Sequence, residues 1–373
     1  MNGKEKFVIQ DFLIQLQQID YFNILETLTP IILCYVTNRA TNNYVLHKNY
    51  KPKNIKKVSL PPELKKEYSD LDINMMVNKK FGHSLRKFAQ VMIQNFPEED
   101  LINFYNNINT LKTTHSSFKL ENLIFNNNTV GVYDVKKNII TVDENKFSIS
   151  IYHELLHMAS ATYKDGIRYS GFHQSSLKPG IASLGMGLNE GYTELLSRRY
   201  FVEDGGSAKA YEYEVIIADR VEKIVGKERM ESLYLNANLH GLIQELKQFS
   251  NEEDIMKFIS STDFVFLHLD DENYMLFEKK MLTNSLKEIN KFLIKVYSKK
   301  LLLQYQEKSI TYDQITTQLA KYVSSLSSTL RIDKRFYEIL SDEELEECFE
   351  AVFGKTNVSI TFNTDGNLSP MKK

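Results

Sequence analysis

The sequence is poor in the residues that interrupt regular structure. Its 373 residues include only 15 glycines and 7 prolines and no tryptophan, whereas an average chain has about 7% glycine and about 5% proline. So few chain breakers favour long helices over a sandwich of many short strands joined by turns. The content of 42% hydrophobic and 25% charged residues is ordinary for a globular protein and excludes wholesale disorder.

Cysteine, excess charge and long apolar runs are also scarce. Cys34 and Cys348 lie near opposite ends of the sequence and cannot form a disulfide framework, which fits a reducing compartment or two buried thiols. The 46 basic and 48 acidic residues nearly balance, so we expect no nucleic-acid partner. No apolar run reaches the about 18 residues that span a bilayer, and residues 1–22 lack the apolar core and cleavage site of a signal peptide. We therefore expect no membrane span and a cytoplasmic location, with leaderless secretion as the alternative.

Hydrophobic periodicity predicts an α+β, predominantly α-helical fold. A β-hairpin is expected within 123–142, turning between Asp134 and Asn138. Glycines at helix ends (Gly226, Gly354) are expected to be left-handed caps, and Ser341 with Glu344 forms a capping-box pattern. Helices are expected at 7–28, 79–95, 148–163, 188–202, 208–225, 228–248, 275–305, 312–331 and 342–353. Residues 48–67 read as a basic linker, and the chain after Asn363 as a loose tail.

The chemistry concentrates in a helix that carries the motif HExxH. In the segment 148–163, His153, Glu154 and His157 form this motif within an apolar stripe. Residues four positions apart share one face of a helix, so both imidazoles can reach the same metal ion. Glu154 follows the first histidine at the edge of that face, where it can accept a proton from a metal-activated water.

A second helix supplies a candidate third ligand. Glu190 lies 33 residues beyond His157 in the run LNEGYTELL. Catalytic zinc sites use three protein ligands and keep one position free, so Glu190 completes a His₂Glu set. Glu194, one turn later, can accept the free ring N–H of a ligand histidine and fix its tautomer. The alternative for Glu194 is a surface acid paired with Arg198 at the i+4 position.

These residues resemble the gluzincin metallopeptidases, zinc enzymes in which HExxH is followed downstream by a helix with a glutamate ligand. The matching pattern is His153-Glu154-x-x-His157 with Asn189-Glu190-x-x-Thr193-Glu194, and the resemblance covers residues 148–202. It implies zinc bound by His153, His157 and Glu190 and a zincin-like core. The spacing between the two helices is longer than usual in the best-known members, and no aminopeptidase signature precedes the motif.

The resemblance also implies a histidine or tyrosine that stabilises the oxyanion formed during peptide hydrolysis. His173 and Tyr169 are the favoured catalytic candidates, in a segment 163–187 that we expect to be a glycine-rich loop beside the cleft. The other candidates are Tyr163, Tyr192, Tyr211 and His240.

The expected organisation is an N-terminal, mostly helical region (1–115), the zincin-like core (116–250) and a C-terminal helical region (251–373) with the loose tail. The expected function is hydrolysis of a peptide or protein substrate with one zinc ion per chain, in an undetermined oligomeric state. One alternative is an inactive zincin-like or helical regulatory protein in which zinc only joins two helices; the lack of a cysteine near the motif weighs against it. Another is a non-proteolytic hydrolase on the same scaffold.

Overall fold

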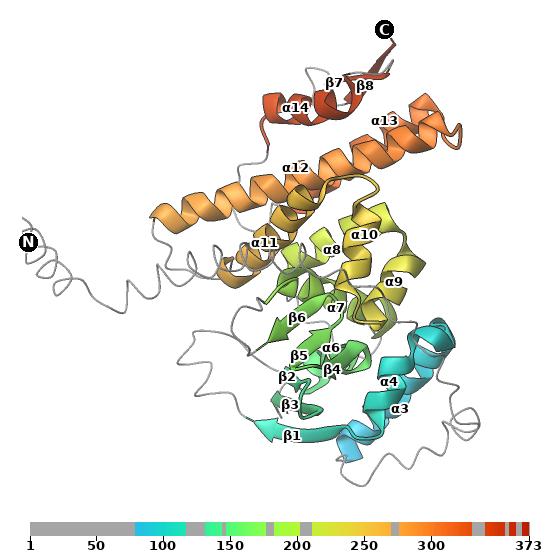
Figure 1. Ribbon diagram of the computed structural model, residues 1–373, viewed down its shortest axis with the longest axis vertical. Coiled ribbons are helices and arrows are strands. Elements are labelled where there is room, and N and C mark those ends of the chain that lie inside the picture. Colours follow the sequence, from blue (N-terminus) through green and yellow to red (C-terminus); the bar gives the residue numbers. More distant parts are fainter. Residues whose placement is uncertain are drawn as a thin grey trace, which may run out of the picture.

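The computed structural model describes residues 79–116, 131–143, 147–176, 183–201, 211–269, 276–329, 340–354, 358–362 and 368–372. Within them the fold is α+β and predominantly helical, which confirms the predicted class (Figure 1). The expected helix 7–28 and the linker 48–67 lie outside the described residues. No helix in the described part of the chain combines the length and apolarity needed to cross a membrane.

Most helices lie where the apolar periodicity predicts them. They are α3 (Lys79–Asn95), α4 (Ile102–Ile108), α6 (Phe147–Ser160), α7 (Met186–Phe201), α8 (Glu212–Val225), α9 (Lys227–Leu235), α10 (Leu239–Leu246), α11 (Glu252–His268), α12 (Leu276–Gln306), α13 (Tyr312–Thr329) and α14 (Asp342–Phe353). A 3₁₀ turn, η2 (Glu98–Asp100), precedes α4. The periodicity missed α4 and α11, although Asn251 caps α11 by accepting a hydrogen bond from the Asp254 amide.

The predicted hairpin is confirmed and belongs to a three-stranded sheet. Strands β1 (Lys112–Ser116), β3 (Ile139–Asp143) and β2 (Gly131–Asp134) are ordered β1-β3-β2, with β1 parallel and β2 antiparallel to β3. The Asp134 carboxylate accepts the backbone amides of Lys136 and Lys137, which closes the turn. In this strand order β2 lies at one edge of the sheet within the described residues, and it contacts α6.

The segment expected to be a loop at 163–187 instead begins with a second sheet. Strands β4 (Ala161–Lys164), β5 (Ile167–Ser170) and β6 (His173–Ser176) form an antiparallel meander. Its first turn places Asp165 and Gly166 at φ values of 55° and 83°, the conformation that an Asp-Gly pair favours in tight hairpins. The Asp165-Gly166 pair is therefore the sequence signal that could have predicted these strands in place of a loop.

Two further expectations are corrected. The helix predicted at 228–248 is divided into α9 and α10, because Ala237 has a φ of 51° and Asn238 caps α10 by accepting from the Gly241 amide. Gly354 has a φ of −58° and is not a left-handed cap, whereas Gly226 does have a positive φ of 100°. The capping box that begins α14 is present.

The C-terminal segment, which was expected to be a loose tail, contains a paired strand. Strands β7 (Val358–Phe362) and β8 (Leu368–Lys372) form an antiparallel ladder. Val358 lies opposite Lys372, and Phe362 lies opposite Leu368. Backbone pairing therefore extends into the part of the chain beyond Asn363.

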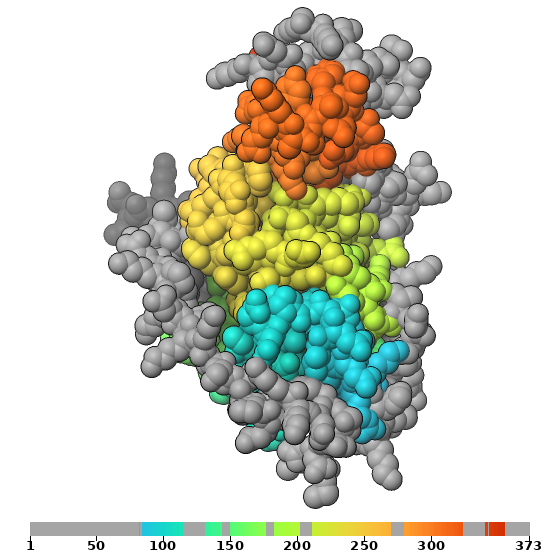
Figure 2. Space-filling model, turned by 90° about the vertical axis from the view of Figure 1, so that its right-hand side faces the viewer, coloured from blue at the N-terminus to red at the C-terminus, as the bar shows by residue number. Residues whose placement is uncertain are grey.

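One cluster of buried apolar residues runs from Leu85 in α3 to Phe353 in α14. All three regions expected from the sequence contribute to it. Figure 2 shows the arrangement along the long axis, with α3 and α4 at one end, α9 to α11 in the middle, and α12 with α13 at the other end. The 31-residue α12 buries the predicted apolar face, including Leu282, Leu286 and Ile289, against neighbouring helices.

Candidate metal centre

Helix α6 is the structural centre of the candidate site. Every residue from Ser150 to Ser160 is buried, so the helix is enclosed rather than lying on the surface with one apolar stripe. The Tyr152 ring stacks on Phe201 of α7, with 4.5 Å between centroids. At its C-terminal end the Asn107 side-chain amide donates to the carbonyls of Met158 and Ala161, at 2.8 and 2.7 Å. The ring stacking holds α6 against α7, and the Asn107 amide ties its C-terminal end to α4 while satisfying the Met158 carbonyl, which the helix leaves unpaired.

The three expected metal ligands converge. His153 Nε2 lies 3.0 Å from His157 Nε2 and 3.1 Å from Glu190 Oε2, and the third side of the triangle, His157 Nε2 to Glu190 Oε2, is 3.4 Å. Zinc bonds to imidazole nitrogen and carboxylate oxygen are about 2.0–2.2 Å, so tetrahedral ligands lie roughly 3.3 Å apart. The observed spacings match this value within a few tenths of an ångström. The donor set therefore fits a zinc-sized ion.

The non-coordinating nitrogen of His153 is held by Glu194. His153 Nδ1 lies 3.2 Å from Glu194 Oε2, and the other carboxylate oxygen of Glu194 accepts from Arg198 Nε at 2.8 Å. Glu194 is only 4% exposed, so it is not a surface acid, although its ion pair with Arg198 does form. A carboxylate at Nδ1 leaves Nε2 directed at the metal position, which is the arrangement common to zinc-binding histidines.

His157 is oriented by neighbours that the sequence did not single out. Its Nδ1 lies 3.4 Å from Ser170 Oγ and 3.4 Å from Asn189 Nδ2. Because the Ser170 hydroxyl donates to the His157 carbonyl at 3.2 Å, its oxygen is free to accept the His157 Nδ1 proton. The Asn189 amide cannot accept that proton, since its Oδ1 is directed to the Phe172 amide. A metal ion on Nε2 would leave the ring proton on Nδ1, where Ser170 Oγ can accept it; the Asn189 amide nitrogen at the same distance can only donate.

The charges of the site are strongly coupled. Burial lowers the pKa of His153, but hydrogen bonds to Glu190 and Glu194 outweigh burial and raise the pKa to about 10. Burial raises the pKa of Glu190, but the facing His157 and His153 hold it well below its usual range. In the metal-free protein, the positive charge of protonated His153 thus compensates the negative charge of the Glu190 carboxylate, next to the position that a metal cation would occupy.

The side chain of Glu154, the glutamate of the motif, faces strand β2. The space beside its carboxylate depends on Gly131, where an added Cβ would lie 2.7 Å from Glu154 Oε1. Burial raises the pKa of Glu154, while the positive charges of His153 and His157 oppose the shift. A carboxylate with a raised pKa, beside a candidate metal position and an edge strand, has the properties required of a general base.

Helix α7 is placed by a contact that only the tertiary structure provides. Asp263 of α11 accepts the backbone amides of Gly185 and Gly187, at 2.7 and 2.9 Å, and so caps the start of α7 from a distant part of the chain. Further along α7, a Cβ on Gly191 would lie 2.2 Å from the Glu214 carbonyl oxygen, so glycine allows α8 to pack closely. Glu190 lies between these two points of contact.

Two of the oxyanion candidates lie near the metal ligands. His173 is directly opposite Ser170 in the β5–β6 ladder, so the two side chains share the face toward His157. Burial is the main cause that lowers the pKa of His173 to about 4, and therefore its ring is neutral near pH 7. The Tyr211 ring lies 5.5 Å from the His153 ring, at a residue with a left-handed φ of 58°. Burial and the nearby carboxylates of Glu190 and Glu154 raise the pKa of Tyr211 well above its usual range, so its hydroxyl keeps its proton.

The remaining candidates are placed differently. Tyr169 precedes Ser170 in β5, and successive side chains of a strand point to opposite faces, so Tyr169 points away from the face that contacts His157. Tyr192 donates to Glu222 at 2.8 Å within the α7–α8 interface. Tyr163 is 46% exposed, and His240 lies on the surface next to Gln244.

Comparisons with protein-family models, with curated proteins and with solved structures find no match to this chain. The description of the site consequently rests on its own geometry.

Proposed function

We propose that this protein is a zinc-dependent peptidase. The observation that carries the proposal is the convergence of His153, His157 and Glu190 from two helices, with their ligand atoms within 4.8 Å of one another. When bound, zinc would polarise a carbonyl group and lower the pKa of water toward neutrality. Imidazole and carboxylate ligands without thiolates, together with one free position, are typical of catalytic rather than structural zinc sites.

The residues of this chain would supply the remaining steps. Glu154 takes a proton from the attacking water and passes it to the leaving nitrogen of the scissile peptide bond. Tyr211 and His173, both neutral near pH 7, would donate hydrogen bonds to the oxyanion. Strand β2, which is an edge strand among the described residues and lies beside Glu154, would offer backbone groups to an extended peptide substrate.

Metal analysis of the purified protein tests the proposed site. The wild type should contain about one zinc per chain, and Glu190→Ala should lose it because two histidines alone bind zinc weakly. Glu228→Ala, which removes an exposed glutamate of α9, is the matched control and should retain the metal. A wild type that takes up no zinc even after incubation with the ion would refute the metal centre.

Hydrolysis of an unfolded protein such as casein tests the activity. Glu154→Gln should abolish cleavage while the zinc content stays at the wild-type level, since the carboxylate acts on water and is not one of the three ligands. Cleavage by Glu154→Gln at the wild-type rate would refute the mechanism. If the wild type binds zinc but hydrolyses no peptide, the result would instead favour the alternative in which the zinc ion has a structural role and only joins α6 and α7.

A further inference from the structure

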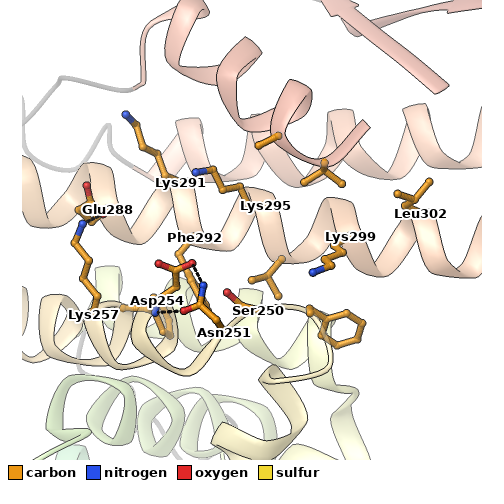
Figure 3. A pocket seen from close by; sticks show the side chains of 15 residues that line it. Ser250, Asn251, Asp254, Lys257, Glu288, Lys291, Phe292, Lys295, Lys299 and Leu302 are labelled. Atoms are coloured by element: carbon orange, nitrogen blue, oxygen red, sulfur yellow. Dashed lines mark hydrogen bonds and ion pairs between the residues drawn. The ribbon is translucent and has the colours of Figure 1, made fainter. Parts of the chain in front are cut away.

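A second candidate site lies between helices α11, α12 and α14, in a part of the molecule that the proposed peptidase mechanism does not use. A pocket of about 540 Å³ opens here, within the range of about 300–1,000 Å³ typical of small-molecule sites. Figure 3 shows α11 and the segment at Ser250 and Asn251 on one side and the lysines of α12 on the other. None of its lining residues is a metal-ligand candidate, although α11 also carries Asp263, which caps α7.

The inner part of the pocket is apolar. The rings of Phe258 on α11 and Phe292 on α12 stack with 4.5 Å between centroids and are 1% and 7% exposed. Further apolar lining comes from Phe249, Val296, Leu302 and Val352. This interior can cover a hydrocarbon or aromatic group, which is favourable because apolar surface is removed from water.

The rim of the pocket is positively charged. Lys291, Lys295 and Lys299 follow one another at four-residue steps on α12, so they share one face at intervals of about 6 Å. Lys257 joins them from α11, and only Asp254 and Glu288 contribute negative charge to the lining. The lining alone has two more positive than negative charges, and Glu344 of α14, which pairs with Lys291, reduces this excess to one.

Two of these lysines have no partner of their own. Lys257 pairs with Glu288, and Lys291 pairs with Glu344 of α14 at 2.9 Å. Lys295 and Lys299 form no ion pair with any residue that the structure describes. The Asp254 carboxylate accepts from the Asn251 side chain at 2.8 Å and forms no ion pair with either lysine among the described residues. Two exposed cations thus stand beside an apolar interior.

We propose that this pocket binds a small organic anion, an apolar body with one carboxylate, phosphate or sulfonate group. The apolar body lies against Phe258 and Phe292, and the anionic group contacts Lys295 and Lys299. The apolar interior disfavours a bare inorganic ion, and the excess positive charge favours an anion over a neutral or cationic ligand of the same size.

The experiment uses 8-anilinonaphthalene-1-sulfonate as the probe, an aromatic body with one sulfonate whose fluorescence rises on binding. The full-length protein should bind about one probe molecule per chain, and Lys295→Glu/Lys299→Glu should weaken binding at least about tenfold. The control Lys164→Glu/Lys308→Glu makes the same change of net charge at exposed positions outside the pocket and should bind as the wild type does. N-phenyl-1-naphthylamine, which has the same aromatic body without the sulfonate, should bind the wild type at least about tenfold more weakly.

A second variant tests the pocket by steric blockage rather than by a change of charge. It also provides a result if Lys295→Glu/Lys299→Glu does not fold. Ala351→Trp places a large side chain at the mouth of the pocket and should also remove probe binding. Probe binding that is unchanged by both variants, or weakened equally by the control, would overturn the proposal. Decanoate and decyl phosphate, used as competitors, distinguish a carboxylate from a phosphate ligand; equal displacement by inorganic phosphate would overturn the assigned ligand class.

Discussion

Zinc binding should depend steeply on pH, because a metal ion at this site must displace a proton. In the metal-free protein His153 Nδ1 faces Glu194 and its Nε2 faces Glu190, at 3.2 and 3.1 Å, and the two contacts raise its pKa to about 10. Zinc requires the Nε2 lone pair. At any pH well below about 10, binding therefore releases one proton from His153.

The magnitude follows from proton linkage. Release of one proton makes the apparent affinity rise about tenfold per pH unit, or about 1.4 kcal/mol. Between pH 6 and pH 8 the dissociation constant for zinc should accordingly fall about a hundredfold. The metal-free protein has the opposite dependence: the raised pKa of His153 stabilises it fully below the unfolded-state value of about 6.5, and this contribution is lost as the pH rises through about 10.

Competition with a chelating dye of known pH dependence, at fixed ionic strength, measures the affinity at pH 6, 7 and 8. Calorimetry in two buffers with different protonation enthalpies measures the number of protons released, which should be about one. An affinity that is equal at pH 6 and pH 8, with no proton released, would refute this account of the charges in the site.

Four substitutions test the parts that support the site. Glu194→Gln should weaken zinc binding by about 10–100-fold, because the ligand histidine loses the carboxylate that orients it. Tyr211→Phe should lower kcat about a hundredfold without changing KM or zinc content, since only the oxyanion contact is lost. Gly191→Ala should lower the free energy of unfolding by about 3 kcal/mol or more, as its Cβ would lie 2.2 Å from the Glu214 carbonyl oxygen. Asp263→Ala should cost about 1–2 kcal/mol, measured by denaturant unfolding, because it removes the cap of α7.

Two control variants and two contradicting outcomes complete these tests. Gly82→Ala, in a helix where the added Cβ meets no atom closer than 4.0 Å, should not destabilise the protein. Tyr163→Phe alters an exposed tyrosine and should leave kcat unchanged. Unchanged zinc affinity in Glu194→Gln, or unchanged stability in Asp263→Ala, would mean that the observed hydrogen bonds do not support the site.

Local patterns in the sequence determined most of the helices and the pair of histidines that one of them carries. The periodicity at 79–95 predicted α3 to the residue, and the alternation around Asp134 to Asn138 predicted the β2–β3 hairpin. The i,i+4 spacing of His153 and His157 places both rings on one helical face, whatever surrounds the helix. Such features depend on neighbours within a few residues, so they can be inferred without the rest of the chain.

Contacts between distant segments were decided only by the tertiary structure. No local pattern places Glu190 3.1 Å from His153, pairs Ser170 with His157, or brings Asp263 to the start of α7. The same holds for the pocket between α11, α12 and α14, whose residues come from three helices and a connecting segment. These arrangements follow from close packing of whole helices and sheets, which depends on the combined shape of many side chains rather than on short-range periodicity.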